Sequence, residues 1–211
     1  MENFIKKTKI NFNFIIFLLG IILLYSVFPV KNFFEHIILI LLFLFIIPFI
    51  YDYFNKKNEP YIFREINNIK ICILGFIMLI LSLIISYFLF KYSFNFDYYV
   101  NIEYFDSLYQ FFSYELLLIL PFTLIYSYFF INFVFFRLEN IYGYFLASIF
   151  QFLIIIAMSF LGGAVFSICL PYIVFAPMAV FLASKTRNFI YPAIIQFILI
   201  FIIDSFFVNI L

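Results

Sequence analysis

Charged side chains are scarce in this chain of 211 residues: 11% of the residues are Asp, Glu, Lys or Arg, whereas 68% are hydrophobic. Soluble domains carry about 25% charged residues, so this chain has too little polar surface to cover a water-facing globule. The same composition excludes an intrinsically disordered protein, because disordered chains are poor in apolar residues and rich in charge. The net charge of +1 gives no reason to expect nucleic acid as a partner.

Metal-ligating residues and glycines are also few. The chain has one histidine, His36, and two cysteines, Cys72 and Cys169. The separation of the cysteines matches no paired metal-ligand spacing. No two of the five glycines stand four residues apart, so the GxxxG motif of helix dimers is absent. The sequence therefore predicts neither a bound metal nor another cofactor.

Long apolar runs are abundant. A helix that crosses about 30 Å of hydrocarbon needs about 20 mostly apolar residues. The runs that approach this length are residues 11–28, 34–51, 71–90, 111–136, 141–160, 164–183 and 189–208. They predict an all-α, polytopic transmembrane bundle with about seven spans, in contact with the lipid bilayer as one membrane domain.

The basic residues predict the orientation of these spans, because Lys and Arg accumulate on the cytoplasmic side of a membrane. With the N-terminus inside, the longest cytoplasmic linker is 52–70, and only Lys31 and Lys91 fall outside. The basic residues that fall inside are Lys6, Lys7, Lys9, Lys56, Lys57, Arg64, Lys70, Arg137, Lys185 and Arg187. One span more or fewer at the C-terminal end leaves this count unchanged, since residues 201–211 carry no basic side chain.

Two carboxylates lie within predicted spans. Glu115 is one turn into the fourth span from its outer end, and Asp204 is near the outer end of the seventh. Ionisable groups in hydrocarbon are costly, so each is a candidate for function. We favour interfacial carboxylates with access to water. The alternative, a paired proton or ion site, requires the two helices to be adjacent.

The last hundred residues contain two stretches with a recognisable pattern. Residues 185–196 read Lys-Thr-Arg-Asn-Phe-Ile-Tyr-Pro-Ala-Ile-Ile-Gln, and residues 142–148 read Tyr-Gly-Tyr-Phe-Leu-Ala-Ser. The first resembles the final motif region of the CPBP family, the CAAX-protease and bacteriocin-processing (Abi) intramembrane metalloproteases. The second resembles the start of a helix in that family. The resemblance covers residues 115–203, which implies variable leading spans in 1–110 and CPBP-like core helices in 111–211.

The resemblance places the family's catalytic motifs on residues that lack the required groups. Its Glu-Glu-x-x-x-Arg motif falls on residues 126–131, its two histidines fall on Ser159 and Gln196, and its asparagine falls on Ile200. The motif-equivalent positions are Tyr126, Ser127, Ile131, Ser159, Gln196 and Ile200. A shifted register that uses Phe136 and Arg137 for the motif's Phe-Arg pair would place the two acids on Asn132 and Phe133. Both registers lack the acids.

This loss predicts a family-like scaffold without catalytic residues. Metal-assisted hydrolysis needs imidazoles or carboxylates to hold the cation and a base beside its water. We therefore expect a protein that binds a membrane segment, a lipid or a partner protein. The uncharged polar groups offered for such binding are those of Ser127, Asn132, Gln151, Ser159 and Gln196. Their alternative role is to form hydrogen bonds between the helices of the bundle itself.

Two other functions remain open at this point. One is an active CPBP-like intramembrane endopeptidase that uses other groups, which only the resemblance of the scaffold supports. The other is a small transporter component that captures a substrate near Glu115 and Asp204 and docks on an energising partner. In each case we expect a multi-pass protein of a cell membrane, the plasma membrane of a bacterium.

Overall fold

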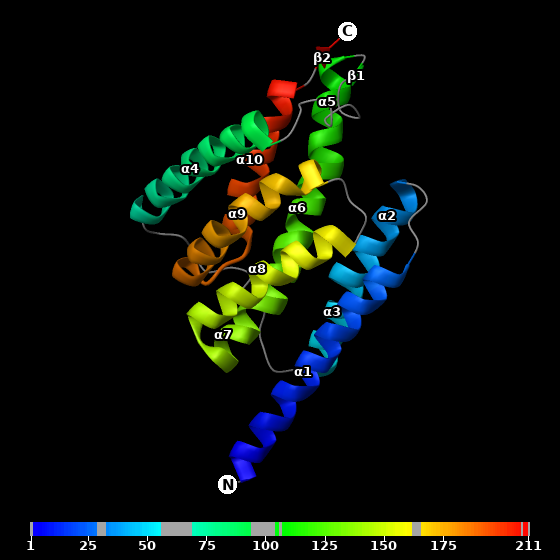
Figure 1. Cartoon of the computed structure of the whole chain (residues 1–211), viewed down its shortest axis with the longest axis vertical. Helices are drawn as coiled ribbons and strands as arrows, with labels where there is room; N and C mark the ends of the chain where they lie inside the picture. Colours follow the sequence, from blue (N-terminus) through cyan, green and yellow to red (C-terminus); the bar gives the residue numbers. More distant parts are fainter. Residues whose placement is uncertain are drawn as a thin grey trace.

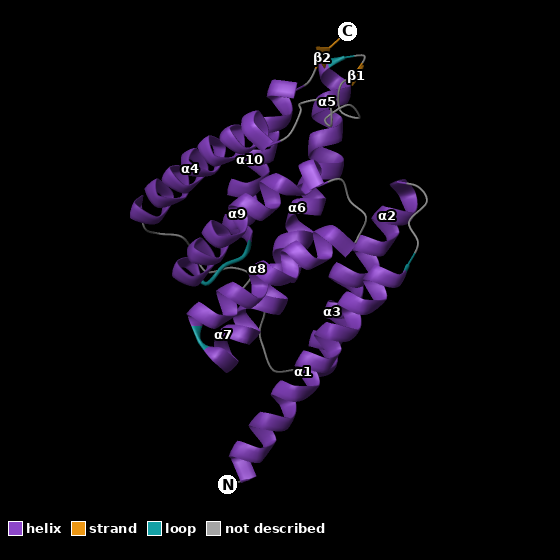
Figure 2. Cartoon of the chain, viewed as in Figure 1, coloured by secondary structure: helices purple, strands orange, loops and turns teal. Residues whose placement is uncertain are grey.

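The computed structural model describes residues 2–28, 33–55, 69–93, 104–105, 107–161, 166–207 and 209–210. Nearly all of them are helical (Figure 2). The α-helices are α1 (Glu2–Val27), α2 (Phe33–Ile40), α3 (Ile47–Asn55), α4 (Ile69–Ser93), α5 (Leu108–Tyr114), α6 (Leu120–Ser127), α7 (Phe136–Tyr142), α8 (Tyr144–Leu161), α9 (Phe166–Thr186) and α10 (Ile190–Phe207). Three π-helical segments are η1 (Leu41–Ile46), η3 (Glu115–Ile119) and η4 (Tyr128–Phe135).

The elements α5, η3, α6, η4 and α7 form one continuous helix over Leu108–Tyr142, which we call the central helix. All eight residues of η4 are buried. This segment contacts α8, α9 and η1, and α6 contacts α10. The side chains of residues 128–135 are aromatic or branched aliphatic except for Asn132, and the hydroxyl of Tyr128 is the other polar group of η4. They therefore form the middle of the core.

Two groups of helices lie on either side of the central helix and α8 (Figure 1). Helices α4, α9 and α10 pack on one another, while α1, α2 and α3 lie on the other side of the bundle. Helix α1 begins at one end of the molecule, and the short strand β2 (Asn209–Ile210) lies at the opposite end. There β2 pairs in parallel with β1 (Tyr104–Phe105).

Local sequence sets the breaks between helices. Gly143 separates α7 from α8 with a φ of 81°, a conformation that glycine adopts without steric cost. Helix α9 ends where Arg187 takes a φ of 51° and its N–H donates to the carbonyl of Ala183 (2.7 Å). The side chain of Asn188 then accepts a hydrogen bond from the N–H of Ile190 (2.7 Å), which caps the start of α10.

The predicted helical class is confirmed, because each predicted apolar run overlaps a helix. Among the described residues, three helices are long and apolar enough to cross a membrane. They are Glu35–Phe54, Ile69–Leu89 and Leu108–Tyr142, and shorter apolar helices cover Phe12–Val27, Tyr144–Phe160, Leu170–Thr186 and Ile190–Phe206.

Three details differ from the sequence-based boundaries. The predicted linker 52–70 begins inside α3, and its residues 56–68 lie outside the described part of the chain. The predicted break near residues 136–141 occurs instead at Gly143, because the helix continues through α7 to Tyr142 before the positive φ of that glycine ends it. The proposed division between residues 110 and 111 falls within α5.

Candidate functional site

Two of the motif-equivalent residues meet in the interior of the bundle. Ser127 ends α6 and Gln196 lies in α10, and both are almost fully buried. The hydroxyl of Ser127 donates a hydrogen bond to Oε1 of Gln196 at 3.4 Å. This bond joins residues that are far apart in the sequence and helps to hold α6 against α10, which are in contact. It is an interhelical bond of the kind that the sequence left open as the alternative to ligand binding.

The other motif-equivalent residues take different positions. Tyr126 packs its ring against Phe130 (4.3 Å between centroids) and Tyr172 of α9 (4.7 Å). Ser159 donates to the carbonyl of Ile155 in its own helix (2.8 Å). The remaining two positions, Ile131 and Ile200, are buried apolar side chains. The contacts therefore unite Ser127 with Gln196, whereas Ser159 is bonded within α8.

Two further polar side chains lie in the core near the middle of the chain. Asn132 is buried within η4, and Gln151 is buried in α8 with 1% of its surface exposed. The Oε1 atom of Gln151 accepts no hydrogen bond from a described donor. A buried carbonyl oxygen without a donor costs about 1–3 kcal/mol, so Gln151 locally destabilises the core of the bundle.

A metal site needs more ligating side chains than these residues supply. Within the described ranges, no three His, Cys, Asp or Glu side chains lie close enough together to hold a metal ion. Ser127 and Gln196 supply one hydroxyl and one amide, which are weak zinc ligands compared with imidazole, thiolate or carboxylate. The arrangement is suited to forming hydrogen bonds rather than to activating water.

Glu115 and Asp204 correct a sequence-based expectation. We expected interfacial carboxylates with access to water, but the structure buries both, with exposures of 0% and 2%. The two side chains interact with each other across the contact between the central helix and α10. The helices are held together there by the rings of Phe111 and Phe201, whose centroids are 5.7 Å apart. The condition for a paired carboxylate site, adjacent helices, is therefore met.

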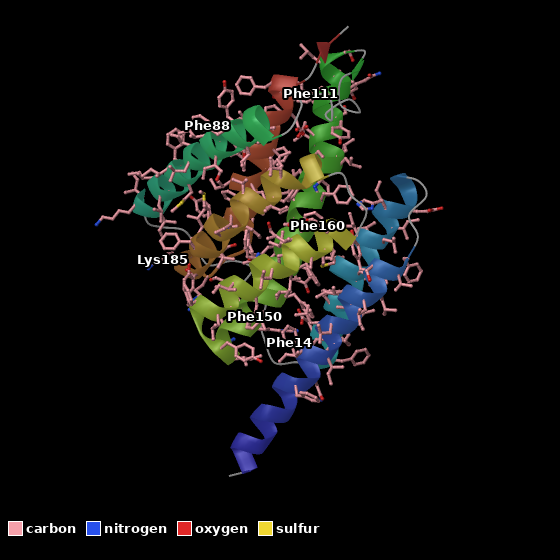
Figure 3. All side chains as sticks on the ribbon, in the orientation of Figure 1. Phe14, Phe88, Phe111, Phe150, Phe160 and Lys185 are labelled. Carbon is pink, nitrogen blue, oxygen red and sulfur yellow. The ribbon has the colours of Figure 1, made fainter. Side chains whose placement is uncertain are left out.

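A partly buried ion pair lies toward the opposite end of the bundle. Arg137 of α7 pairs with Asp52 of α3, and the hydroxyl of Tyr128 donates to the second oxygen of Asp52 (3.0 Å). The guanidinium also lies over aromatic rings, with its Cζ atom 4.4 Å from the centroid of Phe133 and 5.2 Å from that of Phe14 (labelled in Figure 3). We call Asp52, Tyr128 and Arg137 the Arg137 cluster.

No pattern in the sequence indicates the Arg137 cluster. In the sequence, residue 52 falls at the start of the predicted linker, and Arg137 is a cytoplasmic charge or, in the shifted register, the arginine of the family's Phe-Arg pair. The two residues belong to helices that are distant in sequence, so no helical spacing relates them. A second pair, Arg187 with Glu139 (2.5 Å), joins the end of α9 to α7.

Comparison with known proteins finds no relative of this chain. No family model matches the chain, and neither a curated protein nor a solved structure is significantly similar to it.

Proposed function

We propose that the chain is a multi-pass protein of a bacterial plasma membrane, with seven spans, a cytoplasmic N-terminus and an external C-terminus. The three long apolar helices and the four shorter ones support this number of spans. The position of α1 and β2 at opposite ends of the molecule supports an odd number. The orientation rests on the asymmetry of Lys and Arg along the chain.

We further propose that the protein has a CPBP-like scaffold without catalysis and acts by binding a membrane segment or a membrane-protein partner. The observation that carries this proposal is the hydrogen bond between Ser127 and Gln196. The resemblance assigns these two residues to positions where the family's motifs have an acid and a histidine, and side chains at those two positions have to lie together for metal chemistry. Here the same pair of positions supplies uncharged polar groups.

The binding role uses the polar side chains that remain in the core. Side-chain hydrogen bonds between membrane helices contribute only about 0.6 kcal/mol on average, so exchanging one for a bond to a partner costs little. Gln151 offers an acceptor oxygen without a donor from the described residues. Gln151 is 1% exposed, so a polar group on an incoming segment would reach that acceptor only if α8 moved away from its neighbours, and the exposed apolar side chains of α8 would give such a segment a surface to pack on.

The replacement Gln196→Leu tests this role. We expect it to remove a partner that co-purifies with the tagged wild-type protein in mild detergent, as measured by quantitative mass spectrometry. Stability should fall by only about 0.6 kcal/mol, the value of the lost bond to Ser127. Thr123→Val is the matched control, because Thr123 is equally buried but donates to Ile119 in its own helix.

Loss of stability in Gln196→Leu with association intact would show that this residue only holds the helices together. The active endopeptidase is tested separately, by cleavage of a prenylated or signal-like membrane peptide. Cleavage that a chelator abolishes, together with stoichiometric zinc, would refute a non-catalytic scaffold.

The buried pair of Glu115 and Asp204 favours a second candidate, the small transporter component. Paired acidic groups in spans commonly mark ion or substrate pathways. This candidate predicts that a small molecule is retained in stoichiometric amount after purification and is lost in Glu115→Gln. Its absence from wild-type protein, measured by native mass spectrometry, would exclude the capturing role.

A further inference from the structure

Glu115 and Asp204 contact each other inside the protein, away from its surface. Glu115 begins η3, and Asp204 lies near the end of α10. Both side chains are at least nine-tenths buried, and the carboxyl groups lie within hydrogen-bonding reach of each other. Phe111 and Phe201 lie about one helical turn from Glu115 and Asp204 along their helices, and their ring centroids are 5.7 Å apart. Phe111 is labelled in Figure 3 where the central helix approaches α10.

Tyr114 is a further ionisable neighbour of this pair. Tyr114 lies close enough for its phenol to interact electrostatically with both carboxyl groups, and Asp204 is the charged neighbour of Glu115. Among the described residues, no Lys, Arg or His is a neighbour that would neutralise Glu115. Neither oxygen of Glu115 accepts a hydrogen bond from a described donor. An ionised Glu115 would thus be buried without a counter-charge and without donors.

The protonation of the pair follows from its geometry. An ionised carboxylate is only an acceptor, so two ionised carboxylates form no hydrogen bond and repel each other strongly in an apolar interior. One proton changes the contact: the protonated carboxyl donates its O–H to the other, and a single negative charge is spread over the pair. Carboxyl pairs in enzymes share one proton for the same reason.

We infer that Glu115 and Asp204 form a proton-binding site that holds one shared proton at neutral pH inside the membrane-embedded bundle. The ligand is a proton, and its binding groups are the two facing carboxyls. The helix takes its π-helical form from Glu115 onward, and such insertions are frequent at functional positions. The site is separate from the Ser127–Gln196 bond, so it stands or falls independently of the proposed binding role.

Infrared spectroscopy of the purified full-length protein in lipid nanodiscs tests the site. We expect the wild type to show the carbonyl-stretch band of a protonated carboxylic acid at pH 7, with a shift in heavy water. The band should change frequency in Glu115→Gln and in Asp204→Asn, because it belongs to the pair, and it should be absent in the double variant. Glu139→Gln, which removes a carboxylate paired with Arg187, is the control and should keep the band.

Absence of the band from wild-type protein at pH 7, or its persistence in the folded double variant, would overturn the inference. Selective ¹³C-labelling of the glutamates or the aspartates makes the assignment in the unsubstituted chain, so the test does not depend on folding of the variants. A band that shifts with neither label would also contradict the shared proton. Partner binding by the same samples is measured separately, so failure of one proposal leaves the other standing.

Discussion

Helices α4 and α10 approach each other closely where the side chain of Tyr191 lies over Gly75. The hydroxyl of Tyr191 donates to the carbonyl of Ile71 (3.0 Å), so the ring crosses from α10 to the surface of α4. A Cβ atom on Gly75 would overlap the hydroxyl and stand 2.8 Å from Cζ of the same ring. Glycine at residue 75 therefore permits the close approach of the two helices.

We expect Gly75→Ala to destabilise the protein by about 1–3 kcal/mol, because overpacking outweighs the better helix propensity of alanine. Gly20→Ala is the matched control. That glycine is also within a helix, but an added Cβ meets nothing within 4 Å. The control should gain up to about 1 kcal/mol. Unfolding in detergent followed by circular dichroism measures both, and equal stabilities would contradict the tight contact.

Single residues also show the limits of sequence reasoning. The cost of charge in hydrocarbon was enough to select Glu115 and Asp204 as candidates. Their burial and their contact could not be derived, because the apolar runs are hydrophobic on all sides and do not indicate which face of a helix meets its neighbour. The same limit applies to Ser127 and Gln196, which the resemblance placed at related positions but which only packing brings to 3.4 Å.

The Arg137 cluster acts at the scale of whole elements, because it joins α3 to the central helix. Asp52 provides the counter-charge, Tyr128 donates a hydrogen bond to it, and rings of α1 and η4 cover the guanidinium. The side chains of Arg137 and Asp52 are 12% and 21% exposed. The Arg187–Glu139 pair has the same charges but leaves 37% of the arginine side chain exposed.

We therefore expect Asp52→Asn to cost more stability than Glu139→Gln. Removing one partner of a buried pair costs about 3–5 kcal/mol, and the partial exposure of Asp52 places the expectation at the lower end of that range. An exposed pair contributes about 0–1 kcal/mol. Urea unfolding of the two variants in the same detergent compares them. Equal losses would show that the cluster does not hold α3 in place.

The sequence was sufficient to predict that each apolar run is helical, but it predicted the ends of the helices less well. Length and hydropathy were sufficient for the runs because a chain this apolar satisfies its backbone groups within helices. The extension of the fourth run to Tyr142 was missed, since Glu139 and Arg137 look like loop residues in the sequence. In the structure, both charged residues are helical, and they pair with Arg187 and Asp52, respectively. The pairing of β1 with β2 had no sequence signal, because each strand has two residues.

At the scale of the whole molecule, the bundle is arranged around the buried central helix. One end of the bundle carries the Arg137 cluster and the turn between α9 and α10, where Lys185 is exposed (Figure 3). The other end carries the start of α5, where Tyr109 is exposed, and the Glu115–Asp204 pair. The proposed orientation places the first end in the cytoplasm and the second outside.

The most direct measurement is the accessibility of single cysteines at these two ends. Cys72 and Cys169 are first replaced by Ser, and Tyr109→Cys and Lys185→Cys are then made separately in that background. A membrane-impermeant maleimide added to intact spheroplasts should label Tyr109→Cys, and it should label Lys185→Cys only after permeabilisation. Labelling of Lys185→Cys in intact spheroplasts, or of both positions from the same side, would contradict the seven-span arrangement with a cytoplasmic N-terminus.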